Sequence, residues 1–161
     1  MDSKSFNHIS KGGDFDKKSP HKEKQTFEQL AQEAQNLCFK DTHSELLKMS
    51  ETSKLDAVLQ SIENFVQFYG KDVSTSQLRN VYDNVIKTNS VNTLKLIRPQ
   101  LAYMAGRKQD REKKEEENNK KTFLAFLDFL IKSVDSESQR KEFKTFFESV
   151  VAYHKFYSNK K

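Results

Sequence analysis

The residues best suited to chemistry are cations and one tyrosine near predicted helix boundaries. Arg79, Arg98, Arg107 and Lys108 lie at such boundaries, and Tyr103 stands close to the last two. A guanidinium binds phosphate through two parallel N–H donors, or stacks on a base. A tyrosine beside it stacks on a base or bonds a ribose hydroxyl. These five residues are candidate nucleic-acid contacts, and ordinary surface charge with helix packing is the alternative interpretation.

Patterns typical of catalysis or metal binding are missing from the sequence. Its four histidines, namely His8, His21, His43 and His154, stand at no metal-ligand spacing from one another or from Cys38. No Gly-rich phosphate loop and no nucleophile elbow follows a predicted strand. We therefore expect no enzymatic activity, no catalytic residue, no metal and no cofactor.

Two of these side chains are expected to have structural roles. Cys38 is the single cysteine, so the chain forms no internal disulfide, and its neighbours Leu37 and Phe39 predict a buried apolar thiol. His154 falls on an apolar stripe, which predicts a partly buried, hydrogen-bonded ring.

The charge of the chain favours a polyanionic partner without requiring one. The 161 residues carry a net charge of +5, and the pI is about 9.1. Many soluble proteins reach such an excess by chance. No apolar run is long enough to span a bilayer, and we expect a cytoplasmic protein without a membrane partner.

Apolar residues at helical spacing dominate the chain after its first two dozen residues. They predict helices over residues 26–39, 54–69, 74–90, 91–107, 123–134 and 136–157. Ser74 and Ser136 each precede a glutamine by three residues, a capping-box spacing, and Gly70 stands where a helix should end. Pro99 should kink or divide its helix. The mixed-charge run 108–121 is either a helical extension or a loop.

These elements predict an all-α fold, a compact bundle of five to six helices with a flexible basic N-terminal tail. No segment alternates with a period of two, and no repeat is visible. Residues 1–24 hold too few apolar groups to order themselves, so we expect a flexible tail at 1–24 and a helical bundle domain at 25–161. Each apolar stripe must be covered by another helix.

Three short motifs carry a family resemblance. Thr75–Asn80 (TSQLRN) opens a helix, Arg98–Arg107 (RPQLAYMAGR) follows, and Phe146–Lys155 (FFESVVAYHK) lies near the end. In this order and spacing they resemble the small subunit of the type III-A CRISPR effector, the Csm complex. The resemblance covers about residues 55–157, and the first fifty or so residues have no counterpart in it.

The resemblance implies a helical subunit that stacks in several copies and contacts the target strand without reading its sequence. Its implied partners are guide RNA and target RNA, other Csm complex subunits and copies of itself, and cleavage belongs to other subunits. Carried over by position, Arg79, Arg98, Tyr103 and Arg107 are the expected RNA contacts, with Lys108 as a weaker one.

The third motif is expected to serve packing and docking. The residues expected to pack and dock are Phe147, Glu148, Tyr153 and His154. Of these, Glu148 could anchor an arginine within the bundle.

The sequence therefore predicts a non-catalytic RNA-binding small subunit of a type III-A CRISPR ribonucleoprotein, acting in antiviral defence. The alternative is a helical protein–protein interaction module with no direct nucleic-acid contact. A helix-turn-helix DNA binder is a further rival. It is disfavoured because the helix from Ser74 turns Asn80, Asp83 and Asn84 outward rather than a row of base-reading cations.

Overall fold

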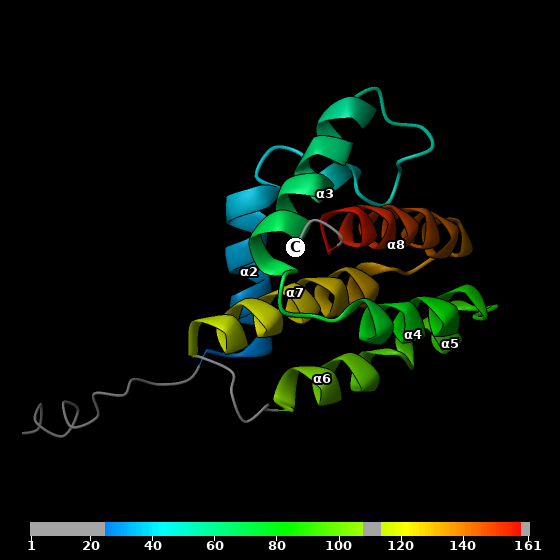
Figure 1. Cartoon of the computed structure of the whole chain (residues 1–161). Coiled ribbons are helices and arrows are strands. Elements are labelled where there is room, and N and C mark those ends of the chain that lie inside the picture. Colours follow the sequence, from blue (N-terminus) through cyan, green and yellow to red (C-terminus); the bar gives the residue numbers. More distant parts are fainter. Residues whose placement is uncertain (1–24, 108–113, 159–161) are drawn as a thin grey trace, which may run out of the picture.

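The computed structural model describes residues 25–107 and 114–158, and within these ranges the chain is an all-α bundle without strands. This confirms the predicted fold class, whereas the predicted tail, residues 1–24, lies outside the described residues. The helices, drawn in Figure 1, are α2 (Phe27–Cys38), the 3-10 turn η1 (His43–Glu45), α3 (Leu55–Tyr69), α4 (Thr75–Ile86), α5 (Val91–Lys95), α6 (Arg98–Gly106), α7 (Lys114–Ser133) and α8 (Glu137–Ser158).

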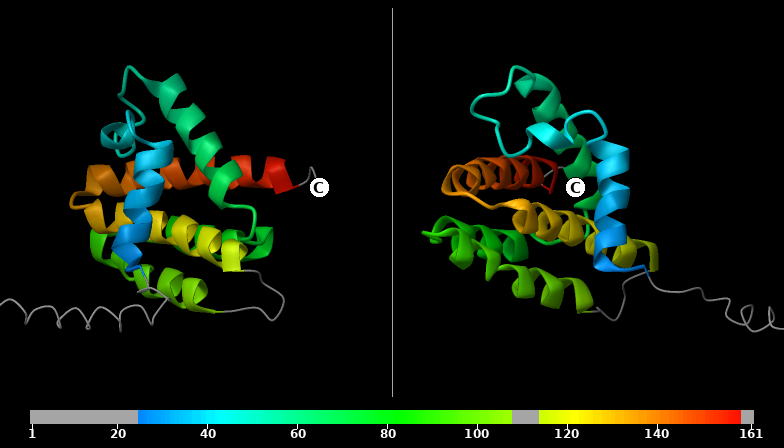
Figure 2. Two further views of the ribbon diagram at one scale, coloured as in Figure 1. Left: turned by 90° about the vertical axis from the view of Figure 1, so that its left-hand side faces the viewer. Right: turned by 180° about the vertical axis from the view of Figure 1, so that it is seen from behind.

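Helix α7 lies at the centre of the bundle. Helices α2 and α6 pack against it, α3 contacts it as well, and α8 packs on α3 and α4. All residues from Phe123 to Leu127 are buried, as a helix that is apolar on every side requires. Figure 2 shows α2 and α3 crossing α7 and α8 steeply, while α4 and α6 run roughly along them.

Phenylalanine rings form the middle of the core. Phe39 stacks on Phe126 with ring centroids 4.6 Å apart, and Phe65 stacks on Phe123 at 4.8 Å. Burying one such ring contributes roughly 1.5–3 kcal/mol. Leu37, the apolar neighbour of Cys38 on α2, is 56% exposed. Phe39, just beyond the helix end, turns into the core in its place.

Caps and proline set the helix boundaries. The Ser74 hydroxyl accepts from the Gln77 N–H at 3.0 Å, and the Gln77 side chain accepts from the Ser74 N–H at 3.1 Å, so this capping box is confirmed. Pro99 divides the predicted helix 91–107 into α5 and α6 and lies in the first turn of α6, where its missing N–H costs little.

Two boundary predictions need correction. The helix opening at Ser74 ends at Ile86 rather than at residues 89–90, and the Thr88 hydroxyl donates to the Val85 carbonyl just beyond it. At α8 only half of the capping box forms. The Ser136 hydroxyl accepts from the Gln139 N–H, but the Gln139 side chain accepts from the N–H of the preceding residue, Asp135.

Candidate nucleic-acid interface

The first and third sequence motifs lie side by side in the fold. Thr75–Asn80 forms the first turns of α4, Val151–Lys155 lies toward the end of α8, and these two helices pack together. A groove of about 270 Å³ runs between them. It is lined by Thr75, Leu78 and Arg79 from α4 and by Val151, Ala152, His154 and Lys155 from α8.

His154 joins α8 to the turn that precedes α4. The ring is 3% exposed, and its Nε2 lies 3.1 Å from the Gly70 carbonyl oxygen and 2.8 Å from that of Val73. Carbonyl oxygens only accept, so Nε2 carries a proton. Burial lowers the pKa of His154, and the two carbonyls oppose this shift. The prediction of a buried, hydrogen-bonded histidine is confirmed.

Gly70 permits the close approach that this junction needs. A Cβ atom at this position would stand 2.8 Å from the Val66 carbonyl oxygen and 3.0 Å from the Phe123 ring. The predicted helix end at Gly70 is also confirmed, since α3 stops at Tyr69. The end of α3 is thereby held against α7 and α8, and α4 starts at the edge of α8.

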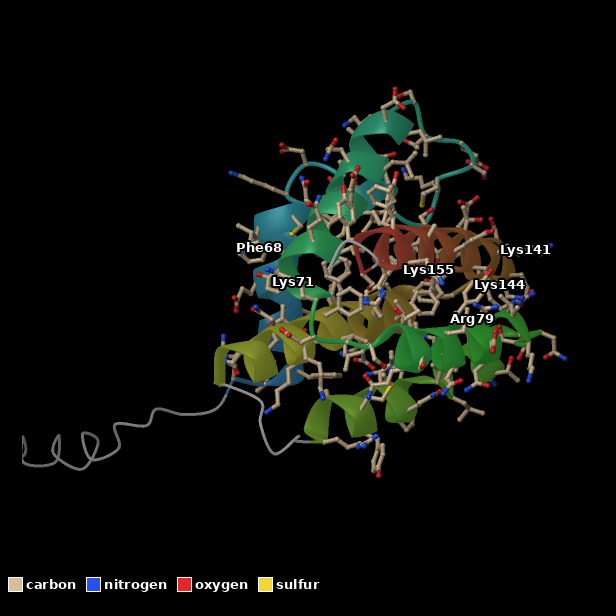
Figure 3. The ribbon with its side chains drawn as sticks, in the orientation of Figure 1. Phe68, Lys71, Arg79, Lys141, Lys144 and Lys155 are labelled. Atoms are coloured by element: carbon tan, nitrogen blue, oxygen red, sulfur yellow. The ribbon has the colours of Figure 1, made fainter. Side chains whose placement is uncertain are left out.

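Cations from three segments lie on the side of the molecule that Figure 3 shows, and two of them, Arg79 and Lys155, line the groove. We define the α4–α8 face by Lys71, Arg79, Lys141, Lys144 and Lys155. Figure 3 shows the last four along α4 and α8, and Lys71 with Phe68 at the end of α3. All are exposed except Lys144, which is half-buried. Like charges on one surface raise its positive potential and attract a polyanion.

Carboxylates near these cations, among them Asp83, Glu137 and Glu148, moderate this charge. Asp83 lies 3.6 Å from the Arg79 guanidinium, and both side chains are largely exposed, at 49% and 65%. Such a pair contributes only about 0–1 kcal/mol, so a phosphate can compete for the guanidinium. Glu148 is exposed on α8. The arginine that α8 buries is Arg140, and Glu137 rather than Glu148 holds it at 2.7 Å.

Lys144 has a structural role as well. Its Nζ donates to the carbonyls of Ile86 and Thr88 at 3.2 and 3.0 Å, and Arg140 donates to Thr88 at 2.8 Å. Both cations therefore neutralise the C-terminal end of α4. Burial, followed by the neighbouring Arg140 guanidinium, lowers the pKa of Lys144. The other four cations of the face remain open to solvent.

The structure brings together only part of the predicted set. Arg79 lines the α4–α8 groove, whereas Arg98 lies between α6 and α7 with its Nε 2.9 Å from Asp128. Arg98 lines a different hollow, beside the start of α2, which shares no residue with the groove. Tyr103 is 69% exposed on α6, and Arg107 is exposed at the end of that helix. Lys108 lies outside the described residues.

The candidate contacts on α8 and at Lys71 were missed from the sequence. On α8 the sequence did carry a signal, a polar stripe of residues spaced three and four apart. The stripe consists of Lys141, Lys144, Glu148, Ala152 and Lys155. The stripe lies opposite the phenylalanines, and nothing in the sequence says that it borders Arg79. For Lys71, which follows the end of α3, no such signal existed.

The parts of the chain that the structure describes contain no group of three or more His, Cys, Asp or Glu side chains able to hold a metal ion. In the same ranges no helix combines the length and apolarity needed to cross a bilayer.

One of the comparisons with known proteins, the comparison with protein families, gives a match. No curated protein and no solved structure gives a match. The model of the family described as Csm2 Type III-A matches residues 24–160. The match includes α2, so the expectation that this helix has no counterpart in the family is wrong. With nearly the whole bundle inside the match, the chain belongs to the Csm2 Type III-A family, the small subunits of the type III-A CRISPR complex.

Proposed function

We propose that this chain is a non-catalytic RNA-binding subunit that contacts a sugar–phosphate backbone through the α4–α8 face. One observation carries the proposal: Arg79 of α4 and Lys155 of α8 line the groove where two motifs meet, and three further cations lie on the same side of the molecule (Figure 3). Phosphates carry no base identity, so binding through such a face tolerates any sequence.

A single copy with a few exposed cations should bind RNA weakly. Copies held along one complex bind the same strand together, because linkage raises the effective concentration of each later contact. This agrees with an accessory role in which guide RNA and target RNA are retained by several copies of the chain and by the other Csm subunits, in antiviral defence.

The predicted contacts divide into three groups under this proposal. Arg79 belongs to the α4–α8 face. Tyr103 and Arg107 stay exposed on α6 and form a second region that RNA could reach. Arg98 is assigned to the positioning of α6, since it forms a charge-assisted pair with the largely buried Asp128.

The test is RNA retention by the reconstituted complex. Complexes are assembled with the unmodified chain or with the Arg79→Ala/Lys155→Ala double variant, and release of labelled target RNA is followed after dilution. We expect intact assembly and faster release with the double variant. The matched control is Lys40→Ala/Lys54→Ala, which removes two exposed charges from the segment between α2 and α3, outside the α4–α8 face.

A second function is favoured by two exposed apolar side chains. Leu96 and Tyr103 are 73% and 69% exposed at the end of α5 and on α6, which suits a protein contact. In this alternative the chain is an interaction module without direct nucleic-acid contact. Equal RNA release from all assembled complexes, combined with failed assembly of a Leu96→Ser/Tyr103→Ser variant, would favour it over RNA binding.

A further inference from the structure

We propose that the groove between α4 and α8 holds one unpaired nucleobase of the bound RNA, with the flanking phosphates on Arg79 and Lys155. The inference rests on the proposed function and adds a ligand chemistry to it. Phosphate contact alone needs a charged surface, whereas this face also contains an apolar recess.

The recess has the composition of a site for a ring. Leu78 is buried, Val151 is half-buried, and Ala152 is exposed, so the walls are aliphatic and the small alanine keeps the space open. A phosphate gains nothing from such walls. A base that enters the recess buries apolar surface away from water, which is favourable. At about 270 Å³ the groove lies below the roughly 300–1,000 Å³ of pockets for drug-sized ligands, which suits a single ring system.

The cations at the rim select the class of occupant. Arg79 and Lys155 line opposite sides of the groove, on α4 and α8. The Arg79 guanidinium is a plane that stacks on a base, and its exposed pair with Asp83 is too weak to prevent reorientation. A flat ring attached to an anionic backbone, as in RNA, matches both the walls and the rim.

A larger hollow in the described part of the chain has the wrong charge for RNA. It measures about 580 Å³ and lies between the 43–51 segment, α7 and α8. Its lining includes the carboxylates Glu51 and Glu142, against a single lysine, Lys48. Carboxylates repel a phosphate backbone, so the smaller recess beside Arg79 is the better base site.

A base that enters this groove must give up its stacking on the adjacent bases of the strand. Bases in a continuous duplex are stacked and paired, and extracting one costs a few kcal/mol, least when the strand is already single. The groove therefore gives the face a preference for RNA with at least one unpaired base.

The experiment compares two oligomers of equal charge on the full-length chain. One is an oligouridine of about 12 nucleotides, within the site sizes of single-strand binding proteins, and the other is its abasic ribose-phosphate equivalent. We expect the oligouridine to bind at least about fivefold more tightly, the lower end of what one stacked base contributes. Equal affinities would overturn the inference and leave the groove to a protein side chain or to no ligand.

A groove-filling variant locates the preference. Ala152→Leu keeps every charge and should reduce the ratio of the two affinities to about one. Ala102→Leu, at an exposed alanine of α6, is the matched control and should retain the ratio. A preference that survives in a folded Ala152→Leu chain would also overturn the inference, and circular dichroism verifies the fold. If Arg79→Ala and Lys155→Ala weaken both oligomers equally while no base preference exists, only the groove is refuted. If they weaken neither, the proposed function itself fails.

Discussion

Removing two cations from the α4–α8 face should flatten the salt dependence of RNA binding. Lys71, Arg79, Lys141 and Lys155 are exposed, whereas Lys144 is bound to carbonyls. With about 0.7 counterions released per contact on a single strand, four contacts give a slope of about −2.8 in log affinity against log salt. Affinity should then fall about 50-fold between about 50 and 200 mM salt.

The double variant Arg79→Ala/Lys155→Ala keeps two of these contacts. Its slope should be about −1.4, and its affinity should fall only about sevenfold over the same range. Fluorescence anisotropy with a labelled oligouridine, repeated at several salt concentrations, measures both slopes. Circular dichroism confirms that helicity is unchanged, as expected for two exposed side chains.

The charge-matched variant Lys40→Ala/Lys54→Ala decides whether location matters. It loses the same net charge away from the face, so its slope should stay near −2.8. If both double variants flatten the slope equally, binding depends on the overall charge of the chain and the local face is refuted. A slope unchanged in the Arg79→Ala/Lys155→Ala chain would refute it directly.

Three further predictions follow from single residues. Glu148→Gln removes a carboxylate from the cationic stripe of α8 and should raise RNA affinity in the same anisotropy assay, whereas a packing residue would not. Gly70→Ala forces a Cβ against a backbone carbonyl and the Phe123 ring. The free energy of unfolding, measured in urea titrations, should fall by about 1–2 kcal/mol. This loss should exceed the stabilisation that alanine gives by reducing the entropy of the unfolded chain. Burial lowers the pKa of His154 in the folded chain below its ordinary value of 6.5. The unfolded chain therefore takes up the proton first, and stability should fall as the pH drops below about 6.5. Thermal unfolding at several pH values measures this, and the His154→Gln chain should lose most of the dependence.

Local chemistry explains why many elements could be predicted from the sequence. A capping box joins residues three apart, and Ser74 and Gln77 form the one that their spacing predicts, whereas Ser136 and Gln139 form only half of theirs. Proline lacks an N–H in any fold, and Pro99 divides α5 from α6 as its type requires. The apolar stripe of α8 likewise predicted that His154 would be buried.

Partners far apart in the sequence could not be predicted in the same way. The partner of Arg98 is an example, because Asp128 stands 30 residues later in the sequence and only the packing of α6 on α7 places the two 2.9 Å apart. Leu37 is apolar, but the packing of α2 on α7 leaves it exposed. Spacing within one helix indicates which side is apolar, but which helix covers that side, and at what crossing angle, depends on the packing of the whole core.

The sequence by itself determined where most helices lie and the order of the motifs, because hydrogen bonds and dihedral preferences act over three or four residues. Only the tertiary structure decided that Arg79 and Lys155, 76 positions apart, share a groove. The His154 ring bonds the Gly70 and Val73 carbonyls and so holds α8 against the turn before α4. This long-range contact places Lys155 of α8 beside Arg79 of α4.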